Sequence, residues 1–325
     1  VLFYDKHLRI PFLCLSFALF WFIYLLKPDT YDIINYTNAV SYPYFEPLFS
    51  LIIIALASFL SNRAVILVIQ ILVGVLTYLT VRVYIADEES IWEKGIAYIL
   101  AFFSVAFTLG VNNALRQFMA SLIIFISIWE FLNHRKVLSF FVFLFTPFIH
   151  FSSVLFYLLS IVILTFSERY YFSDEKLTFS MNLVRLLFFI LAIVGIIALP
   201  VLISFTPYAA YLDRNISSGR VDFTLKYLLV LFSFLVSEFF FGEIDKGEYV
   251  FSQLRILRMF FIILMFVFSF FNSMNEMASR VLAFYFTLDM LVLCLSYVKG
   301  YKTGAFVINL SYAFAINAIN VIGKI

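Results

Sequence analysis

Long apolar runs separated by short polar gaps restrict this chain to one kind of fold. Stretches such as Leu8–Leu26 and Met181–Pro200 reach the roughly twenty residues that a helix needs to cross the hydrocarbon core of a bilayer. Hydrophobic residues make up 64% of the chain and charged residues 13%, and the mean hydropathy is +1.03, values far from those of soluble domains. Lipid does not tolerate exposed irregular backbone or open sheet edges. We therefore predict an all-α polytopic membrane protein, with residues 1–325 forming a single transmembrane domain.

The number of crossings depends on one short apolar run. Lys6 and Arg9 lie at the N-terminal end of the first span, which by the positive-inside rule places the N-terminus in the cytoplasm. The run Pro47–Leu60 holds only about fourteen residues, so we interpret it as a short juxtamembrane helix rather than a crossing. About eleven spans remain. They are predicted at Leu8–Leu26, Ala64–Ile85, Gly95–Gly110, Gln117–Asn133, Val137–His150, Phe151–Phe166, Met181–Pro200, Asp222–Gly242, Ile256–Phe271, Ser279–Val298 and Thr303–Ile322.

The charges between the spans follow this topology. The gaps assigned to the cytoplasm collect basic residues, among which we count Arg255 and Arg258, as the positive-inside rule requires. On the outer face the basic residues are mainly arginines. The outer loop at residues 27–63 carries several prolines and carboxylates and is predicted to hold short helices. We therefore expect the residues that bind and react with the substrate to lie on the outer face.

Several classes of function find no support in the sequence. The formal net charge of +2 leaves no basic stripe for nucleic acid. Cys14 and Cys294 both lie inside apolar runs, and no CxxC or Cys/His cluster indicates a disulfide framework or a metal site. Neither a GxGxxG fingerprint nor a phosphate-binding P-loop is present. We predict no cofactor and no nucleic-acid partner.

The outer loop contributes carboxylates and tyrosines. Asp32, Asp29 and Glu46 have no basic neighbour in the sequence closer than Lys27, so each is a candidate general base, as is His150 between two apolar runs. The order of preference is Asp32, Asp29, Glu46 and His150. For His150 a purely structural role, as a hydrogen-bonded residue at a helix junction, remains open.

Flat amphipathic rings in the same loop suit the stacking of sugars. These candidate sugar-binding residues are Tyr31, Tyr36 and Tyr44, joined by the polar side chains of Asn112 and Glu276. Tyrosines also crowd membrane interfaces as an aromatic belt, which is the alternative for all three. Glu276 has an alternative too, because it could pair with a nearby arginine.

The outer arginines indicate an anionic ligand. Guanidinium offers a rigid fork that matches phosphate, and ionisable residues at a membrane tend to be functional. Arg116 and Arg280 begin long apolar helices with polar neighbours, and Gln117 follows Arg116 directly. The predicted diphosphate-binding residues are Arg116, Gln117, Arg280, Arg214 and Arg220. The alternative is that an arginine snorkels from a helix end to the interface, and we prefer it for Arg63.

Five motifs in this order resemble those of the EpsG family, the Wzy-type bacterial polysaccharide polymerases. The motifs are PDTYDIINY, FEPLF, LRQFMA, FIHFSS and ASRVLAFYF, which together cover Asp29 to Phe286. The family is similar to GT-C glycosyltransferases, whose first outer loop holds an acidic residue and short juxtamembrane helices. The D-x-x-x-Y of the family aligns through Asp32 and Tyr36, while Asp29 falls where some relatives have their first aspartate.

The resemblance implies an activity and partners. A growing glycan would be transferred en bloc from undecaprenyl diphosphate to the terminal sugar of a lipid-linked repeat unit, at the periplasmic face of the bacterial inner membrane. The product would be O-antigen, capsule or exopolysaccharide, and a chain-length regulator would be a partner beside membrane lipids. A flippase or other transporter of lipid-linked oligosaccharides is the main alternative, and an O-antigen ligase is another.

Overall fold

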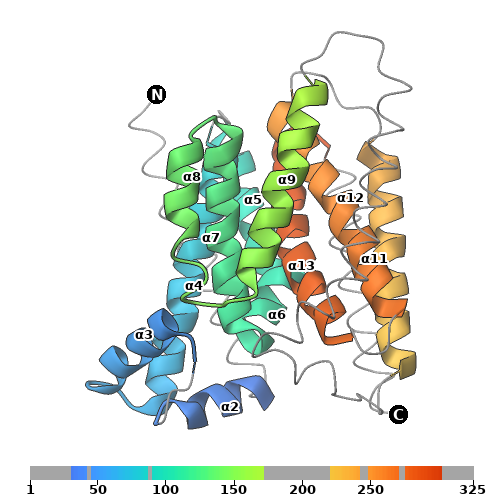
Figure 1. The fold of residues 1–325 in the computed structure, drawn as a ribbon. Helices are drawn as coiled ribbons and strands as arrows, with labels where there is room; N and C mark the ends of the chain where they lie inside the picture. Colours follow the sequence, from blue (N-terminus) through green and yellow to red (C-terminus); the bar gives the residue numbers. More distant parts are fainter. Residues whose placement is uncertain are drawn as a thin grey trace.

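The computed structural model describes residues 31–41, 45–86, 90–171, 220–241, 248–270 and 275–301. Within these ranges it contains eleven helices and no strand, as the sequence predicts (Figure 1). The helices are α2 (Tyr31–Ala39), α3 (Pro47–Ala57), α4 (Asn62–Tyr84), α5 (Ile91–Phe103), α6 (Val105–Asn113), α7 (Leu115–Leu132), α8 (Lys136–Phe143), α9 (Ser153–Tyr171), α11 (Arg220–Phe241), α12 (Tyr249–Phe270) and α13 (Asn275–Val298).

Four helices of the described part are long and apolar enough to cross a membrane. They are α4, α7, α12 and α13, and each overlaps a span predicted from the sequence. The α5–α6 pair adds a fifth candidate if its two helices form one span. Multiple apolar crossings define a multi-pass membrane protein. The predicted spans 8–26, 181–200 and 303–322 lie outside the described residues, so the full count of about eleven stays a prediction.

Ser104 divides the predicted span Gly95–Gly110 into two helices. Its hydroxyl donates to the carbonyl of Ala101 at 2.6 Å and accepts the N–H of Phe107 at 3.2 Å. It thereby ends α5 and begins α6, and the direction of the helix changes by 46° between the two. A side chain that competes for backbone hydrogen bonds bends a helix at that point. The bend redirects α6 toward the start of α7.

Only the first half of the predicted span Val137–His150 is a helix. Only α8 is helical, and its eight residues measure about 12 Å, too short to cross a bilayer. The chain then makes turns through Thr146 and Ile149 to His150. A proline at position 147 cannot donate a helical hydrogen bond, which accounts for the early end of the helix. The prediction was wrong here, and the departure places His150 in a turn.

The short apolar run after the first outer loop forms a short helix, as predicted. Helix α3 is apolar and has eleven residues. Its length of about 16 Å is too short to cross the hydrocarbon core of a membrane. Figure 1 shows α2 and α3 together at one end of the bundle, beside the start of α4. Helix α2 also packs against α6. The first outer loop therefore lies against the helices that follow it.

Helix α13 is the centre of the bundle. Nearly all of its residues are buried, and it packs against α12, α5, α7 and α6. Hydrogen bonds to backbone carbonyls join neighbouring helices: Cys294 Sγ donates to Ala97 at 3.2 Å and Tyr84 Oη to Phe125 at 2.7 Å. Bonds of this kind hold helices together in lipid, where the hydrophobic effect between helices is weak.

Four charged side chains form an ionic cluster between α11, α12 and α13, in which Arg258 and Asp289 are buried and Arg255 and Glu238 are partly exposed. Arg258 is fully buried, with Nε 2.5 Å from Asp289 Oδ1 and Nη1 3.0 Å from Glu238 Oε1. Arg255 Nη2 lies 2.5 Å from the other oxygen of Glu238. The formal charges of the four groups cancel, as a buried cluster requires. The sequence-based placement of Arg255 and Arg258 in a cytoplasmic gap was wrong, because α12 begins at Tyr249 and takes both residues into the bundle.

Candidate functional site

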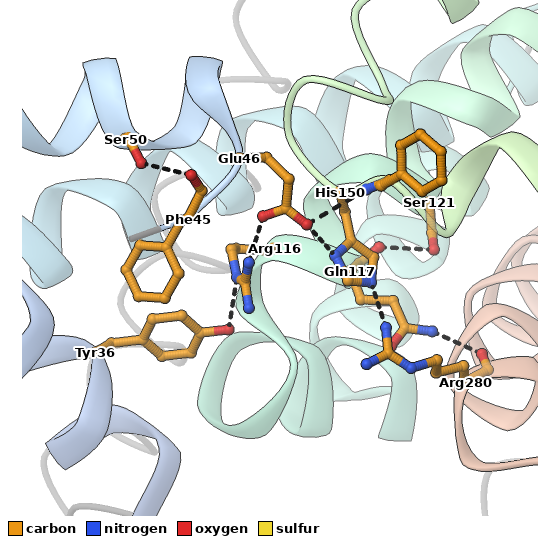
Figure 2. Close-up of polar contacts among 10 residues, drawn as sticks. Tyr36, Phe45, Glu46, Ser50, Arg116, Gln117, Ser121, His150 and Arg280 are labelled. Carbon is orange, nitrogen blue, oxygen red and sulfur yellow. Dashed lines mark hydrogen bonds and ion pairs between the residues drawn. The ribbon is translucent and has the colours of Figure 1, made fainter. Parts of the chain in front are cut away.

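Four helix ends converge at the end of the bundle where α2 and α3 lie. Glu46 immediately precedes α3, Arg116 is the second residue of α7, and Arg280 lies in the second turn of α13. His150 occupies the turn that leads into α9. Figure 2 shows these four side chains in one continuous row of polar contacts. Its contacts join residues that are far apart in the chain, with 70 positions between Glu46 and Arg116 and 130 between His150 and Arg280.

Glu46 is the centre of this row. Its Oε2 forms an ion pair with Nη1 of Arg116. Its Oε1 lies 3.1 Å from Nδ1 of His150 and accepts the backbone N–H of Phe151 at 3.3 Å. Both oxygens are therefore engaged, and Arg116 is a basic neighbour of Glu46 in the folded chain although it is distant in the sequence.

Backbone contacts hold the Glu46 and His150 segments together. The first N–H groups of a helix have no partner inside the helix. In α3 the N–H groups of Leu48 and Phe49 donate instead to the carbonyl of Phe148, at 2.9 and 3.4 Å. The turn before α9 thus caps α3. This arrangement fixes the distance between the Glu46 carboxylate and the His150 ring.

The contacts of His150 determine its protonation pattern. Nη1 of Arg280 lies 3.0 Å from Nε2 of the imidazole. Guanidinium can only donate hydrogen bonds, so Nε2 must be the acceptor and carries no proton. Nδ1 then carries the proton and donates a hydrogen bond to the Glu46 carboxylate. A carboxylate that orients a histidine in this way is a recurrent feature of catalytic general bases.

The surroundings shift the pKa values of both groups. Burial alone would raise the pKa of the Glu46 carboxyl, but the hydrogen bond from His150 and the charge of Arg116 outweigh burial and lower the pKa to about 2. Burial lowers the pKa of His150, and the hydrogen bond to Glu46 only partly offsets this effect. Neutral imidazole beside an ionised carboxylate is therefore the resting state at neutral pH.

Arg116 sits in a cage of aromatic rings. Its guanidinium carbon lies 4.5 Å from the centre of the Phe45 ring, 5.9 Å from that of Tyr36 and 6.0 Å from that of Phe49. Nε also donates to the Tyr36 hydroxyl at 3.5 Å. Cation–π contacts and an ion pair hold this cation in one orientation. Its side chain keeps 24% of its surface exposed, so a ligand can still reach it.

Gln117 joins the two arginine-bearing helices. Its side-chain amide donates to the main-chain carbonyl of Arg280 at 2.6 Å. This bond holds the start of α13 against the start of α7. Gln117, predicted to bind the diphosphate, also lines the cavity described next.

A cavity of about 330 Å³ opens beside the polar row. One part of its wall is polar and includes Tyr36, Arg116, His150 and Arg280. The rest is apolar and comes from α6, α7 and α13, with the lining residues Ala106, Leu109, Gly110, Ala114, Phe118, Leu282, Ala283 and Phe286. A cavity with cationic and apolar walls suits an amphiphile whose anionic group joins a hydrocarbon chain. No cluster of His, Cys, Asp and Glu side chains that could hold a metal ion occurs among the described residues.

The structure brings together six of the predicted site residues. The cavity is lined by Tyr36, Arg116, Gln117, His150 and Arg280, and Glu46 joins them through its contacts with Arg116 and His150. Asp29, Tyr44 and Arg214 lie outside the described residues. The backbones of Tyr31, Asp32, Asn112, Arg220 and Glu276 belong to described helices, while their side chains lie outside the description. The roles predicted for these eight residues stay predictions.

Two aromatic residues of the site were not predicted from the sequence. Phe45 and Phe49 form two sides of the cage around Arg116. Phe45 directly precedes Glu46 in FEPLF, and the four-residue spacing to Phe49 brings the two rings to 5.5 Å, centre to centre. In a chain with 44 phenylalanines, this spacing alone gives no sign of a role.

The fold and the site define a class of protein. It is a multi-pass helical membrane protein with an ionic site and an amphiphilic cavity at one end of its bundle. The profile of the EpsG family matches residues 10–324, nearly the whole chain. The chain belongs to the EpsG family, the family of Wzy-type polysaccharide polymerases. No curated protein and no solved structure gives a significant match.

Proposed function

We propose that this chain is a membrane glycosyltransferase that polymerises lipid-linked oligosaccharides. In this reaction a growing glycan passes en bloc from undecaprenyl diphosphate to the terminal sugar of a lipid-linked repeat unit. Family membership supports the polymerase role. The observation that carries the chemistry is the row Arg116–Glu46–His150–Arg280 along a cavity whose other walls are apolar.

The two arginines are proposed to bind the diphosphate of the donor. The leaving group of the reaction is a diphosphate, so cations near it stabilise the charge that develops in the transition state. Arg116 and Arg280 lie on either side of the Glu46–His150 pair and both line the cavity. The apolar wall between α6 and α13 would take the first part of the hydrocarbon chain.

The base is proposed to be His150, oriented by Glu46. The hydroxyl oxygen of the acceptor sugar forms a bond to the anomeric carbon of the donor, and its proton goes to Nε2 of His150. The bond between that carbon and the diphosphate oxygen breaks, and undecaprenyl diphosphate leaves with the electron pair. Glu46 is a weaker candidate for the proton itself, because its pKa of about 2 makes it a poor base at neutral pH.

The outer carboxylates stay in the proposal as alternatives. Asp32 belongs to the first turn of α2, which packs against α6 and α4 at the same end of the bundle. An aspartate there could also serve the acceptor hydroxyl, as could Asp29. The GT-C-like arrangement of the first outer loop is likewise part of the proposal, supported by the short helices α2 and α3.

The site is proposed to face the periplasm from the inner membrane. An exposed residue at each end of the bundle allows a test: Asn38 on α2 and Asn133 after α7. Single cysteines at these two positions should differ in intact cells, with only Asn38→Cys reacting with an impermeant thiol reagent. Labelling of Asn133→Cys alone would invert the topology and exclude a periplasmic site.

Two histidines provide a matched test of the base. In a deletion strain complemented with variants, His150→Asn should abolish the ladder of glycan chain lengths on gels, and His134→Asn should preserve it. His134 is exposed in the loop after α7, with a φ of 62° that asparagine accepts readily. Protein levels are measured alongside. A normal ladder from His150→Asn at equal expression would remove His150 from the reaction.

The deletion strain also separates the three candidate functions. A polymerase defect leaves single repeat units on the lipid carrier at the outer face. A flippase defect traps the repeats inside, and a ligase defect leaves full-length chains that are not passed to lipid A. The polymerase is favoured because the ionic site lies at helix ends, whereas transporters of the common kind bind substrate near the midplane.

A further inference from the structure

Arg280 blocks the atom that a base would use. Neutral imidazole has one nitrogen with a free lone pair, and in His150 this nitrogen is Nε2. Nη1 of Arg280 donates to that lone pair at 3.0 Å, while Nδ1 is committed to Glu46. His150 is 6% exposed, which leaves little room for another donor. The arrangement is well oriented for proton transfer and yet closed to the acceptor hydroxyl.

The two arginines of the site contact acceptors of different charge. Arg116 has an ionised partner in Glu46 and an aromatic cage around its guanidinium. The contact of Arg280 with His150 is to a neutral acceptor. Guanidinium is charged in both contacts, and a hydrogen bond to an ionised oxygen adds the attraction between opposite charges, which a bond to neutral imidazole lacks. The ionised oxygens of a diphosphate are therefore stronger acceptors for Nη1 of Arg280 than the neutral imidazole is.

We propose that Arg280 keeps His150 inactive in the resting protein, and that the diphosphate of the donor withdraws Arg280 and exposes Nε2. Nη1 of Arg280 then has two successive acceptors, the imidazole first and the diphosphate afterwards. This inference rests on the proposed function, because it assigns the anion to the donor lipid. The charged groups that face His150 in the described part are Glu46 before α3, Arg116 on α7 and Arg280 on α13.

Such a switch would make donor binding precede proton transfer from the acceptor. With the donor absent, Nε2 cannot take a proton from an acceptor hydroxyl. With the donor bound, the same movement that neutralises the leaving group also creates the base. The backbone need not change, because Gln117 holds the main chain of Arg280 against α7 while only the side chain moves.

Chemical modification of histidine measures directly whether Nε2 of His150 is accessible. Diethyl pyrocarbonate acylates an unprotonated imidazole nitrogen whose lone pair is accessible. Purified full-length protein in detergent is treated briefly, and mass spectrometry measures modification of His150 and of the exposed His134 in the same sample. Inorganic pyrophosphate is the probe, with sodium chloride at equal ionic strength as the control.

The proposal predicts slow modification of His150 without pyrophosphate, and a rate increase of about fivefold or more at saturating pyrophosphate. The rate at His134 should stay constant. In Arg280→Met, which keeps the length of the side chain but removes its donors, His150 should react fast with or without the anion. The wild-type comparison needs no substitution, so it decides the question even if the variant fails to fold.

The outcomes separate this proposal from the proposed function. If pyrophosphate raises the melting temperature but slows or does not change the modification of His150, the switch is wrong and the anion site survives. If pyrophosphate changes neither the melting temperature nor the modification rate, the switch and the diphosphate role of the arginines both fail. A faster reaction at His134 as well would indicate general loosening and would also overturn the switch.

Discussion

Nδ1 of His150 lies 3.1 Å from Oε1 of Glu46, although 104 residues separate the two in the chain. The contact is supported on both sides, because the Phe148 carbonyl accepts from the start of α3 and Glu46 accepts from the N–H of Phe151. Two motifs that the sequence shows as separate, FEPLF and FIHFSS, thus form one structural unit. The variants below test what this unit and its surroundings contribute.

Replacing Arg116 by lysine should abolish most polymerisation. The guanidinium serves Glu46, the Tyr36 hydroxyl and, as proposed, a diphosphate, and an ammonium cannot reproduce this geometry. The loss of one stabilising donor suggests a reduction of about 100-fold or more. The matched control is Arg63→Lys at the exposed start of α4, which should keep a normal ladder of chain lengths. Full-length ladders from Arg116→Lys at equal protein level would return Arg116 to a purely interfacial role.

Glu46→Gln should alter the acid stability of the protein. The folded pKa of Glu46, about 2, is below its ordinary value of 4.5, so the ionised carboxylate stabilises the fold fully above pH 4.5. That contribution is lost as the pH falls from 4.5 toward 2. The melting temperature in detergent should therefore decrease more steeply over this window in the parent than in Glu46→Gln. Parallel decreases in the two proteins would contradict the ion pair.

Gly110→Ala should close the cavity from its apolar side. A Cβ atom at this position would overlap the ring of Phe118, so the ring must move. Both residues line the cavity. We expect normal insertion, with polymerisation reduced about tenfold or more. The double variant Gly110→Ala with Phe118→Leu has a smaller side chain opposite the new methyl group and should regain activity. A fully active single variant would show that the cavity wall has no part in the reaction.

Arg258→Met should destabilise the bundle without reaching the candidate site. It leaves Asp289 buried without its ion-pair partner Arg258, which costs about 3–5 kcal/mol for pairs of this kind. Adding Asp289→Leu removes the remaining charge and should restore much of the melting temperature, because Glu238 stays paired with Arg255. Thermal unfolding in detergent measures both. Equal melting temperatures for the single and double variants would argue against a buried pair.

The sequence by itself determined the class of the protein and much of its helix pattern. Hydropathy is a local property, so the spans at α4, α7, α12 and α13 and the shortness of α3 could be predicted from runs of neighbouring residues. Local signals also misled the analysis at Val137–His150, where an apolar run continues past Pro147 while the helix ends at Phe143.

Only the tertiary structure decided which polar residues meet. The sequence identified Glu46, His150, Arg116 and Arg280 separately and ranked His150 last among the candidate bases. The pairing of Glu46 with Arg116, and the tautomer of His150, depend on which helix ends adjoin one another. The same holds for Arg258 and Asp289, assigned by sequence to a gap and a span and joined by the packing of α12 on α13. Contacts between distant segments follow from the packing of whole helices, and no run of neighbouring residues encodes that packing.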